Sequence, residues 1–312
     1  MPSILSDKRF HDEEAAYAWV EARVWPEGPI CPHCGGMERI SKMGGKSTRI
    51  GVYKCYQCRK PFTVKVGTVF EASHVPMRFW LQAMYLMISS KKGVSSNQLH
   101  RTLGVTLKTA WFMSHRIREA MKIVGIEPLG GTDKIVEADE TYFGDRDIVV
   151  TRTKRGKSGH SSKRSIVALV ERGGGSSRLF HVERADRETI NKIIAENVAS
   201  DSHLHTDESR LYADLPVHIG EHHTVYHSGE EYVRYEGDRT IHSNTVENVF
   251  SVFKRGMKGI YQHCAEKHLH RYLAEFDFRY NNRVAIGVND EARADRVVKG
   301  IVGKRLTYKI SH

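Results

Sequence analysis

The feature that most constrains the fold is a pair of C-x-x-C motifs, C-P-H-C from Cys31 to Cys34 and C-Y-Q-C from Cys55 to Cys58. Each pair bends into a knuckle whose two thiolates reach one tetrahedral ion. At this separation the two pairs predict a four-cysteine zinc site in a small ribbon. Because thiolates fill all four positions, a structural zinc is favoured over a catalytic one. His33 lies inside the first knuckle and is expected to be a neighbour rather than a ligand.

Composition narrows the class of protein. The 312 residues are 40% hydrophobic, enough to bury a sizeable core, and 48 Lys and Arg against 37 Asp and Glu give a net charge of +11. Such an excess indicates an anionic partner, most often nucleic acid. The N-terminus has no apolar signal core, and no apolar run is long enough to span a bilayer. Paired cysteines of this kind fit a reducing compartment, so we expect a cytoplasmic, nucleoid-associated protein with no membrane partner.

The first 70 residues read as two segments. Residues 1–26 are expected to form an N-terminal helix, with an acidic start at 12–14 and apolar residues at helical spacing. Residues 27–70 are expected to form the zinc ribbon, closed by a strand over 60–70, where the side chains alternate. The fifth cysteine, Cys264, is expected on a helix far along the chain, with no metal role.

Residues 71–125 show the pattern of a helix-turn-helix module. After a helix with one apolar stripe, Ser95 can cap a second helix, Gly104 can turn the chain, and Thr106 can cap a third. In such modules the first residues of the recognition helix reach base edges, so Thr106, Lys108 and Thr109 are candidate DNA contacts. A three-helix packing module that does not touch DNA is the alternative.

The stretch K-I-V-E-A-D-E-T-Y-F-G, from Lys134 to Gly144, reads as a strand that carries acids. Alternation places Glu137 and Asp139 on one face and Glu140 on the other. A carboxylate that projects from a core strand is costly unless cations pair with it, which favours a metal site. A solvated edge strand is the alternative. We expect a catalytic domain over residues 133–300 and a tail over 301–312.

The next segment, residues 151–164, contains six cationic side chains and no acid. It is expected to be a loop suited to a phosphate backbone, although such a run is often simply a solvated face. The six candidates are Arg152, Lys154, Arg155, Lys157, Lys163 and Arg164. Beyond it the pattern predicts a hairpin of strands over 165–170 and 178–182, a helix over 187–198, and a strand over 203–206 that delivers Asp207, followed by Glu208.

This order of elements is that of an α/β, RNase H-like fold, in which two carboxylates meet across adjacent strands and a third arrives on a late helix. The helix expected over 242–259 carries Glu247 and Lys254 seven residues apart, two turns along one face. Such a pair suits a carboxylate on metal and a lysine on phosphate. A surface ion pair is the alternative, and it is disfavoured because the groups lie about 10 Å apart along the helix.

Together these motifs resemble the IS fifteen-ninety-five superfamily of bacterial insertion-sequence transposases. The resemblance rests on C-P-H-C-G, C-Y-Q-C, G-T-V-F, A-D-E-T-Y-F-G, H-T-D-E-S, H-S-N-T-V-E-N-V-F-S-V-F-K-R-G and L-A-E-F-D-F-R-Y-N-N-R, in the order of the family. It implies a zinc ribbon joined to a DDE-type domain, with Asp139 and Asp207 as the first two catalytic acids. The third is Glu247 or Asn244, as some members use Asn; spacing to Lys254 favours Glu247. Glu208 stands where members often have Gly, so it is expected to add a carboxylate near the metal and to change the local charge balance.

The resemblance also implies an activity. A DDE transposase binds transposon ends, cleaves them by metal-dependent hydrolysis and joins the 3′-OH to target DNA by transesterification. Its cofactors would be two Mg²⁺ or Mn²⁺ ions per active site besides one structural Zn²⁺. The partners would be terminal inverted repeats and target DNA, bound by a homodimer on paired ends, with Lys254 and Arg255 against the DNA. An inactive DNA-binding regulator and a nuclease or recombinase of the same fold are the alternatives.

Overall fold

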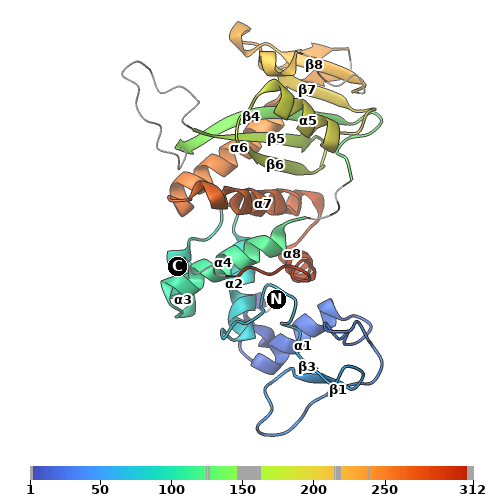
Figure 1. Cartoon of the computed structure of the whole chain (residues 1–312). Coiled ribbons are helices and arrows are strands. Elements are labelled where there is room, and N and C mark those ends of the chain that lie inside the picture. Colours follow the sequence, from blue (N-terminus) through green and yellow to red (C-terminus); the bar gives the residue numbers. More distant parts are fainter. Residues whose placement is uncertain are drawn as a thin grey trace. The chain divides into compact units, whose positions relative to one another are not determined.

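The structure is a computed structural model that describes residues 3–123, 125, 127–145, 163–213, 215, 219–237 and 239–307. The chain forms two units, one of residues 1–122 with 288–312 and the other of residues 123–287 (Figure 1). Within the described ranges no helix is both long enough and apolar enough to cross a membrane.

The first unit opens with short helical turns η1 (Ile4–Ser6) and η2 (Lys8–Phe10) and the helix α1 (Glu13–Val24). The ribbon follows, with β1 (Ile40–Lys42), β2 (Tyr53–Cys55) and β3 (Pro61–Phe62) paired antiparallel in that order. The strand expected over 60–70 is wrong beyond Phe62. There Gly67 takes a φ of 72°, and the amides of Val66 and Thr68 donate to carbonyls three residues back, so the chain folds into turns.

The helices α2 (Met77–Ser89), α3 (Ser96–Leu103) and α4 (Leu107–Met121) follow. The α3–turn–α4 geometry matches the sequence expectation. Ser95 accepts a hydrogen bond from the Gln98 amide at 3.1 Å, and Gly104 ends α3 in the left-handed region at φ 65°. Thr106 accepts from the Thr109 amide at 3.1 Å and starts α4. These caps set where α3 begins and ends and where α4 begins.

The helix α8 (Asp290–Lys299) belongs to the first unit, where it packs with α1, α2 and α4. This differs from the expected catalytic domain, which included residues 288–300. Buried Val297 and Val298 face the helical core, and the Arg9 guanidinium donates to Glu291 across 282 residues of sequence, at 2.6 Å for Nη2. Because these partners are so far apart in the sequence, local patterns could not predict that α8 joins the first unit.

The second unit is built on one five-stranded sheet in the order β6-β5-β4-β7-β8. Its strands are β4 (Ile135–Asp145), β5 (Lys163–Glu171), β6 (Ser177–Val182), β7 (His203–Asp207) and β8 (Glu221–Val225). The first three pair antiparallel, whereas β7 and β8 run parallel to β4. A separate ribbon joins β9 (Arg234–Glu236) to β10 (Arg239–Ile241). The predicted α/β, RNase H-like fold is thereby confirmed.

Helices cover both faces of this sheet (Figure 1). On one face α5 (Arg187–Asn197) packs against Val136, Ala138 and Leu204. On the other, α6 (Asn244–Gly256) and α7 (Leu269–Tyr280) pack against Ile166 and Ala168 of β5. The remaining short helical elements are η4 (Arg210–Tyr212), η5 (His227–Gly229), the π-helical turn η6 (Met257–Tyr261), η7 (Glu266–His268) and η8 (Val284–Ile286). Helices therefore cover both faces of β4, and Leu204 anchors β7 in the core on the α5 side.

Candidate active site and zinc site

Two of the predicted acids lie at the same level of adjacent parallel strands. The β4–β7 ladder pairs Ile135 with His203 and Glu137 with His205. Continued by two residues, this register sets Asp139 opposite Asp207, the last residue of β7. Side chains at matching positions of neighbouring parallel strands project from the same face. The sheet thus brings together two carboxylates that are far apart in the sequence.

The electrostatics of these acids reflect crowding of like charges. Burial raises the pKa of Asp139 to about 8, and the carboxylates of Glu140, Asp207 and Glu247 add to the effect. Burial also raises the pKa of Asp207, reinforced by Glu208. Carboxylates gathered in this way repel one another, and a divalent cation bound between them would offset that repulsion. Three carboxylates also form the oxygen donor set that Mg²⁺ prefers, so the residues fit the expected ion.

The third acid comes from α6. The Glu247 carboxylate lies 3.4 Å from His227 Nε2 and accepts a hydrogen bond from Ser243 Oγ at 3.3 Å. Its side chain is 48% exposed, so it is open to a ligand. Asn244 is the first residue of α6 and is exposed.

A pocket of about 820 Å³ joins these acids to cationic side chains. It is lined by Asp139, Glu140, Thr141, Glu247, Phe250, Ser251, Lys254, Arg255, Lys258 and Gly259. Lys254 and Arg255, both predicted to contact DNA, share it with two of the predicted acids. Lys258 was missed by the sequence reasoning, although it lies eleven residues after Glu247 on the same helical face. The pocket offers carboxylates for a cation beside cations for a phosphate.

Glu137 shares the face of Asp139 but has a different role. Its carboxylate is fully buried and accepts hydrogen bonds from the amides of Thr245 and Val246 at 2.8 and 2.9 Å, and from Arg172 Nε at 2.8 Å. A carboxylate at the N-terminus of a helix also interacts favourably with its dipole. Glu137 therefore caps α6 and fixes where that helix starts. The sequence offered no signal for this contact because it spans more than a hundred residues.

We expect Glu137→Ala to lower the free energy of unfolding by roughly 3 to 5 kcal/mol, because it leaves the partly buried Arg172 without its carboxylate and uncaps α6. Urea unfolding followed by circular dichroism measures this. The control is Glu236→Ala, whose carboxylate pairs with Arg234 at 2.7 Å but is 48% exposed, and which we expect to change little. If the two variants are equally stable, the assigned role of Glu137 is wrong.

Glu208, the departure from the family pattern, is engaged by the backbone. Its two carboxylate oxygens each accept a hydrogen bond of 2.8 Å, one from the His227 amide and one from the Ser228 amide. The Ser228 amide and further backbone hydrogen bonds lower the pKa of Glu208 to about 2. The additional charge expected beside the metal is therefore used to hold the turn η5, whose His227 contacts Glu247.

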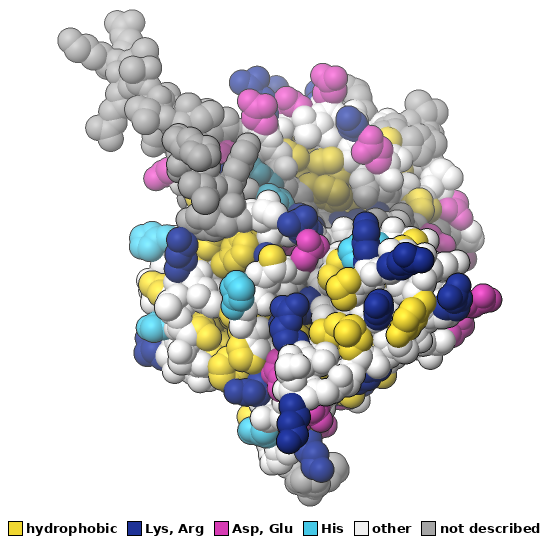
Figure 2. Space-filling model, turned by 60° about the horizontal axis from the view of Figure 1, so that its bottom comes forward, with side chains coloured by type: hydrophobic (Ala, Val, Ile, Leu, Met, Phe, Trp, Pro, Cys, Tyr) yellow, Lys and Arg dark blue, Asp and Glu magenta, His cyan; other side chains and the backbone are white. Residues whose placement is uncertain are grey.

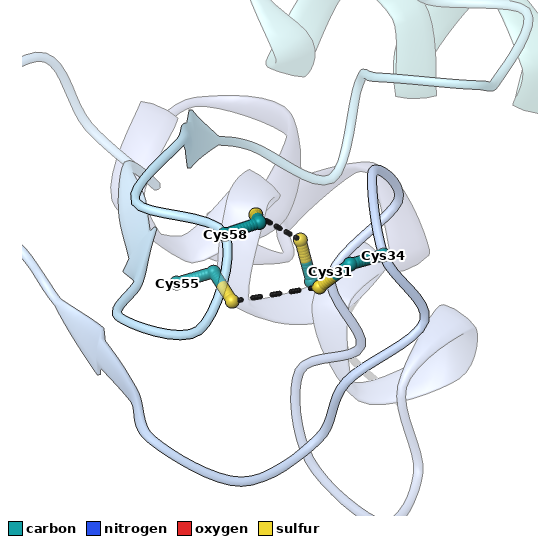
Figure 3. A group of neighbouring side chains, drawn as sticks. All are labelled: Cys31, Cys34, Cys55 and Cys58. Carbon is teal, nitrogen blue, oxygen red and sulfur yellow. Dashed lines mark hydrogen bonds between the residues drawn. The ribbon is translucent and has the colours of Figure 1, made fainter.

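The four cysteines of the two C-x-x-C motifs converge (Figure 3). The sulfur atoms of Cys31 and Cys58 lie 3.6 Å apart, and those of Cys34 and Cys55 lie 3.7 Å apart. A tetrahedral zinc with Zn–S bonds of 2.3 Å sets neighbouring sulfurs about 3.8 Å apart, so the four thiols fit one ion. Cys31 and Cys55 are buried with Phe62 in a small core. A zinc here would be structural, as all four positions are filled by protein.

We expect Cys55→Ser to lose one zinc per chain and binding to transposon ends, because the ribbon depends on the metal for its fold. Elemental analysis and gel-shift assays measure the two effects. Cys264→Ala is the control and should retain both. Cys264 lies in the connection between η6 and η7 rather than on the expected helix, and it packs partly buried against the α6–α7 core. A Cys55→Ser protein that keeps its full zinc content would contradict the assignment.

The remaining predicted DNA contacts lie outside the acidic pocket. Thr106 and Lys108 are exposed at the start of α4, and the hydroxyls of Thr106 and Thr109 lie 2.8 Å apart. Figure 2 shows Lys and Arg side chains over the face that it presents, interleaved with hydrophobic ones. Four predicted loop residues, Arg152, Lys154, Arg155 and Lys157, lie outside the described residues.

The expected basic loop is wrong at its end, because Lys163 and Arg164 begin β5. Arg164 is buried and donates to the Cys264 carbonyl, so it is held inside the fold rather than presented to a phosphate backbone. Lys163 is exposed at the end of the sheet.

Two family models and a relative match most of this chain. Residues 128–281 match the family model of the ISXO2-like transposase domain, and residues 11–61 match that of the transposase zinc-ribbon domain. A relative from Halobacterium salinarum, described as an uncharacterized protein in transposable element ISH50, is 28% identical over 284 residues, covering 87% of this chain and 92% of that protein. A solved simian T-cell lymphotropic virus intasome in complex with the PP2A regulatory subunit B56 gamma matches at 16% identity and a TM-score of 0.29. That match covers 57% of this chain and 63% of the other, less than two thirds of its length. With both of its family domains in place and the motifs in order, the chain belongs to the ISXO2-like transposases of the IS fifteen-ninety-five superfamily.

Proposed function

We propose that this transposase binds the terminal inverted repeats of its element, cleaves them by phosphodiester hydrolysis and joins the 3′-OH to target DNA by transesterification. The observation that carries the proposal is the β4–β7 register, which sets Asp139 level with Asp207. Glu247 lines the same pocket as Asp139. Two of the predicted acids in one pocket, with Asp207 level with Asp139 on the next strand and cations along the pocket wall, suit metal-assisted phosphoryl transfer.

Asp139, Asp207 and Glu247 would hold two Mg²⁺ or Mn²⁺ ions. When bound, the ions would supply activation of water or of a 3′-hydroxyl and stabilisation of the leaving oxygen. The chain itself supplies rigidity. Asp139 projects from a strand that helices cover on both faces, Asp207 ends the neighbouring strand, and Glu247 stands on a helix whose start is capped by Glu137.

The cationic residues would hold DNA. Lys254, Arg255 and Lys258 line the pocket beyond the acids, where each can meet a phosphate of the end being cut. Lys163, exposed at the start of β5, would add a further phosphate contact. In the first unit, Thr106, Lys108 and Thr109 stand at the start of α4, the position from which a recognition helix reads base edges. Asn244 would orient Glu247 or a bound water.

The active form would be a homodimer on paired ends, because each chain would bring its acidic pocket to one end and an element has two ends to cut and join. Cross-linking on DNA that carries both ends distinguishes a dimer from a monomer.

The decisive experiment incubates the full chain with DNA carrying the ends of its own element, target plasmid and Mg²⁺. We expect cleavage at the ends followed by joined products, and neither with EDTA. A nuclease of the same fold would cut without joining, and an inactive regulator would shift the ends in a gel without cutting them. Either outcome would reject the proposal.

A further inference from the structure

A second group of metal-ligating side chains lies at the edge of the sheet, away from the pocket. It consists of His203 on β7 with Glu221 and His223 on β8. The parallel register pairs His203 with Glu221 and His205 with His223, so the three side chains project from one face. The ligand atoms of all three lie within 4.8 Å of one another. This constellation has no part in the proposed chemistry.

The distances fit a tetrahedral ion. Glu221 Oε2 lies 3.0 Å from His203 Nδ1 and 3.2 Å from His223 Nε2. Zinc bonds of 2.0 to 2.1 Å to nitrogen and oxygen would set neighbouring ligand atoms about 3.3 Å apart. Two imidazoles and a carboxylate also suit zinc, leaving a fourth position for water. The side chains are 21%, 44% and 16% exposed for His203, Glu221 and His223, so an ion can reach them from solvent.

One cation already touches this group. Arg239 Nη1 donates to Glu221 Oε2 at 2.6 Å, and its side chain is 57% exposed. This is the same oxygen that lies nearest the two imidazoles, so a bound ion there would require the exposed Arg239 side chain to shift its hydrogen bond to the other oxygen, Oε1. Metal-bound carboxylates are commonly hydrogen-bonded in this way by a neighbouring donor. Arg239 is therefore compatible with a bound ion.

We propose that His203, Glu221 and His223 bind a second zinc ion, distinct from the ion of the ribbon and from the ions of the carboxylate pocket. The ion would clamp the edge strand β8 to β7. At the far end of the same strand pair, Asp207 is in register with Val225. Beyond β8 the chain reaches His227, which contacts Glu247. The ion would thus stabilise the β7–β8 edge of the sheet. This edge positions Asp207 directly and Glu247 through its contact with His227.

The test loads the full chain with Zn²⁺ in the presence of a large excess of Mg²⁺, which would occupy the carboxylate pocket, then removes weakly bound metal by dialysis and measures zinc by elemental analysis. We expect two zinc ions per chain in the wild type, one in His223→Ala, one in Cys55→Ser and none in the double variant. His222→Gln is the matched control. The His222 imidazole is hydrogen-bonded to Thr206 Oγ1 at 2.8 Å and lies on the opposite face of β8 from the three ligands. The variant should therefore keep both ions. One zinc in the wild type would overturn the proposal.

Cobalt spectroscopy of the wild type gives an answer that does not depend on any variant folding correctly. The ribbon ion, bound by four thiolates, gives intense sulfur-to-cobalt absorption. A second equivalent bound by two imidazoles and a carboxylate gives only weak visible bands. We expect this second, sulfur-free spectrum to appear in wild type and in His222→Gln and to be absent in His223→Ala. Saturation at one equivalent, with the thiolate spectrum alone, would reject the site.

Discussion

Asp139→Asn and Asp207→Asn are each expected to reduce end cleavage and strand transfer at least about a thousandfold, while gel-shift binding of the ends stays within about twofold. Both carboxylates lie at one level of adjacent strands, where a neutral amide would bring less charge to a divalent ion. Binding should survive because the proposed DNA contacts are made by other residues. Single-turnover cleavage of labelled end DNA measures the chemical step.

Glu188→Gln, an exposed carboxylate in the first turn of α5, is the control for charge removal and should keep wild-type activity. Circular dichroism of each variant shows whether the sheet is intact. A folded Asp139→Asn or Asp207→Asn protein that still cuts at the wild-type rate would remove that residue from the site.

Glu247→Gln is expected to lose strand transfer about as completely, whereas Asn244→Ala should be impaired about 10- to 100-fold. A carboxylate brings charge to the ions, while an amide brings only a carbonyl dipole. The structure supports this order, since Glu247 lines the pocket and its charge contributes to the raised pKa of Asp139. Strand-transfer assays with pre-cut ends isolate the effect on joining.

Lys254→Ala separates phosphate contact from metal binding. It should weaken engagement of the DNA end, seen as a higher end concentration for half-maximal cleavage, while the Mg²⁺ dependence is unchanged. If Glu247→Gln remains active and Asn244→Ala is dead, Asn244 is the third ligand and this chain groups with the Asn-bearing members of the family.

Much of this molecule was predictable because the relevant signals are local. The knuckle spacing of the cysteines and the caps at Ser95 and Thr106 depend on residues within a turn of each other. The hairpin of β5 and β6 is marked by its glycine turn, and alternation along β4 correctly separates the face of Asp139 from that of Ala138. The RNase H-like order of elements, and with it the adjacency of β4 and β7, followed from these local patterns together with the family resemblance.

What remained undetermined depends on long-range pairing. The sequence pattern makes Glu137 a candidate metal ligand. In the structure its carboxylate instead accepts hydrogen bonds from the first turn of α6, more than a hundred residues later in the chain. Glu208 is expected to add a negative charge near the metal. In the structure its carboxylate accepts a hydrogen bond from the His227 amide. Residues 288–300 read as the end of the catalytic domain, but α8 packs with the first unit. The sequence by itself determined which acids exist and which strands carry them. Only the tertiary structure decided which of them are free to bind an ion, because a buried carboxylate is taken by whichever donors the fold brings to it.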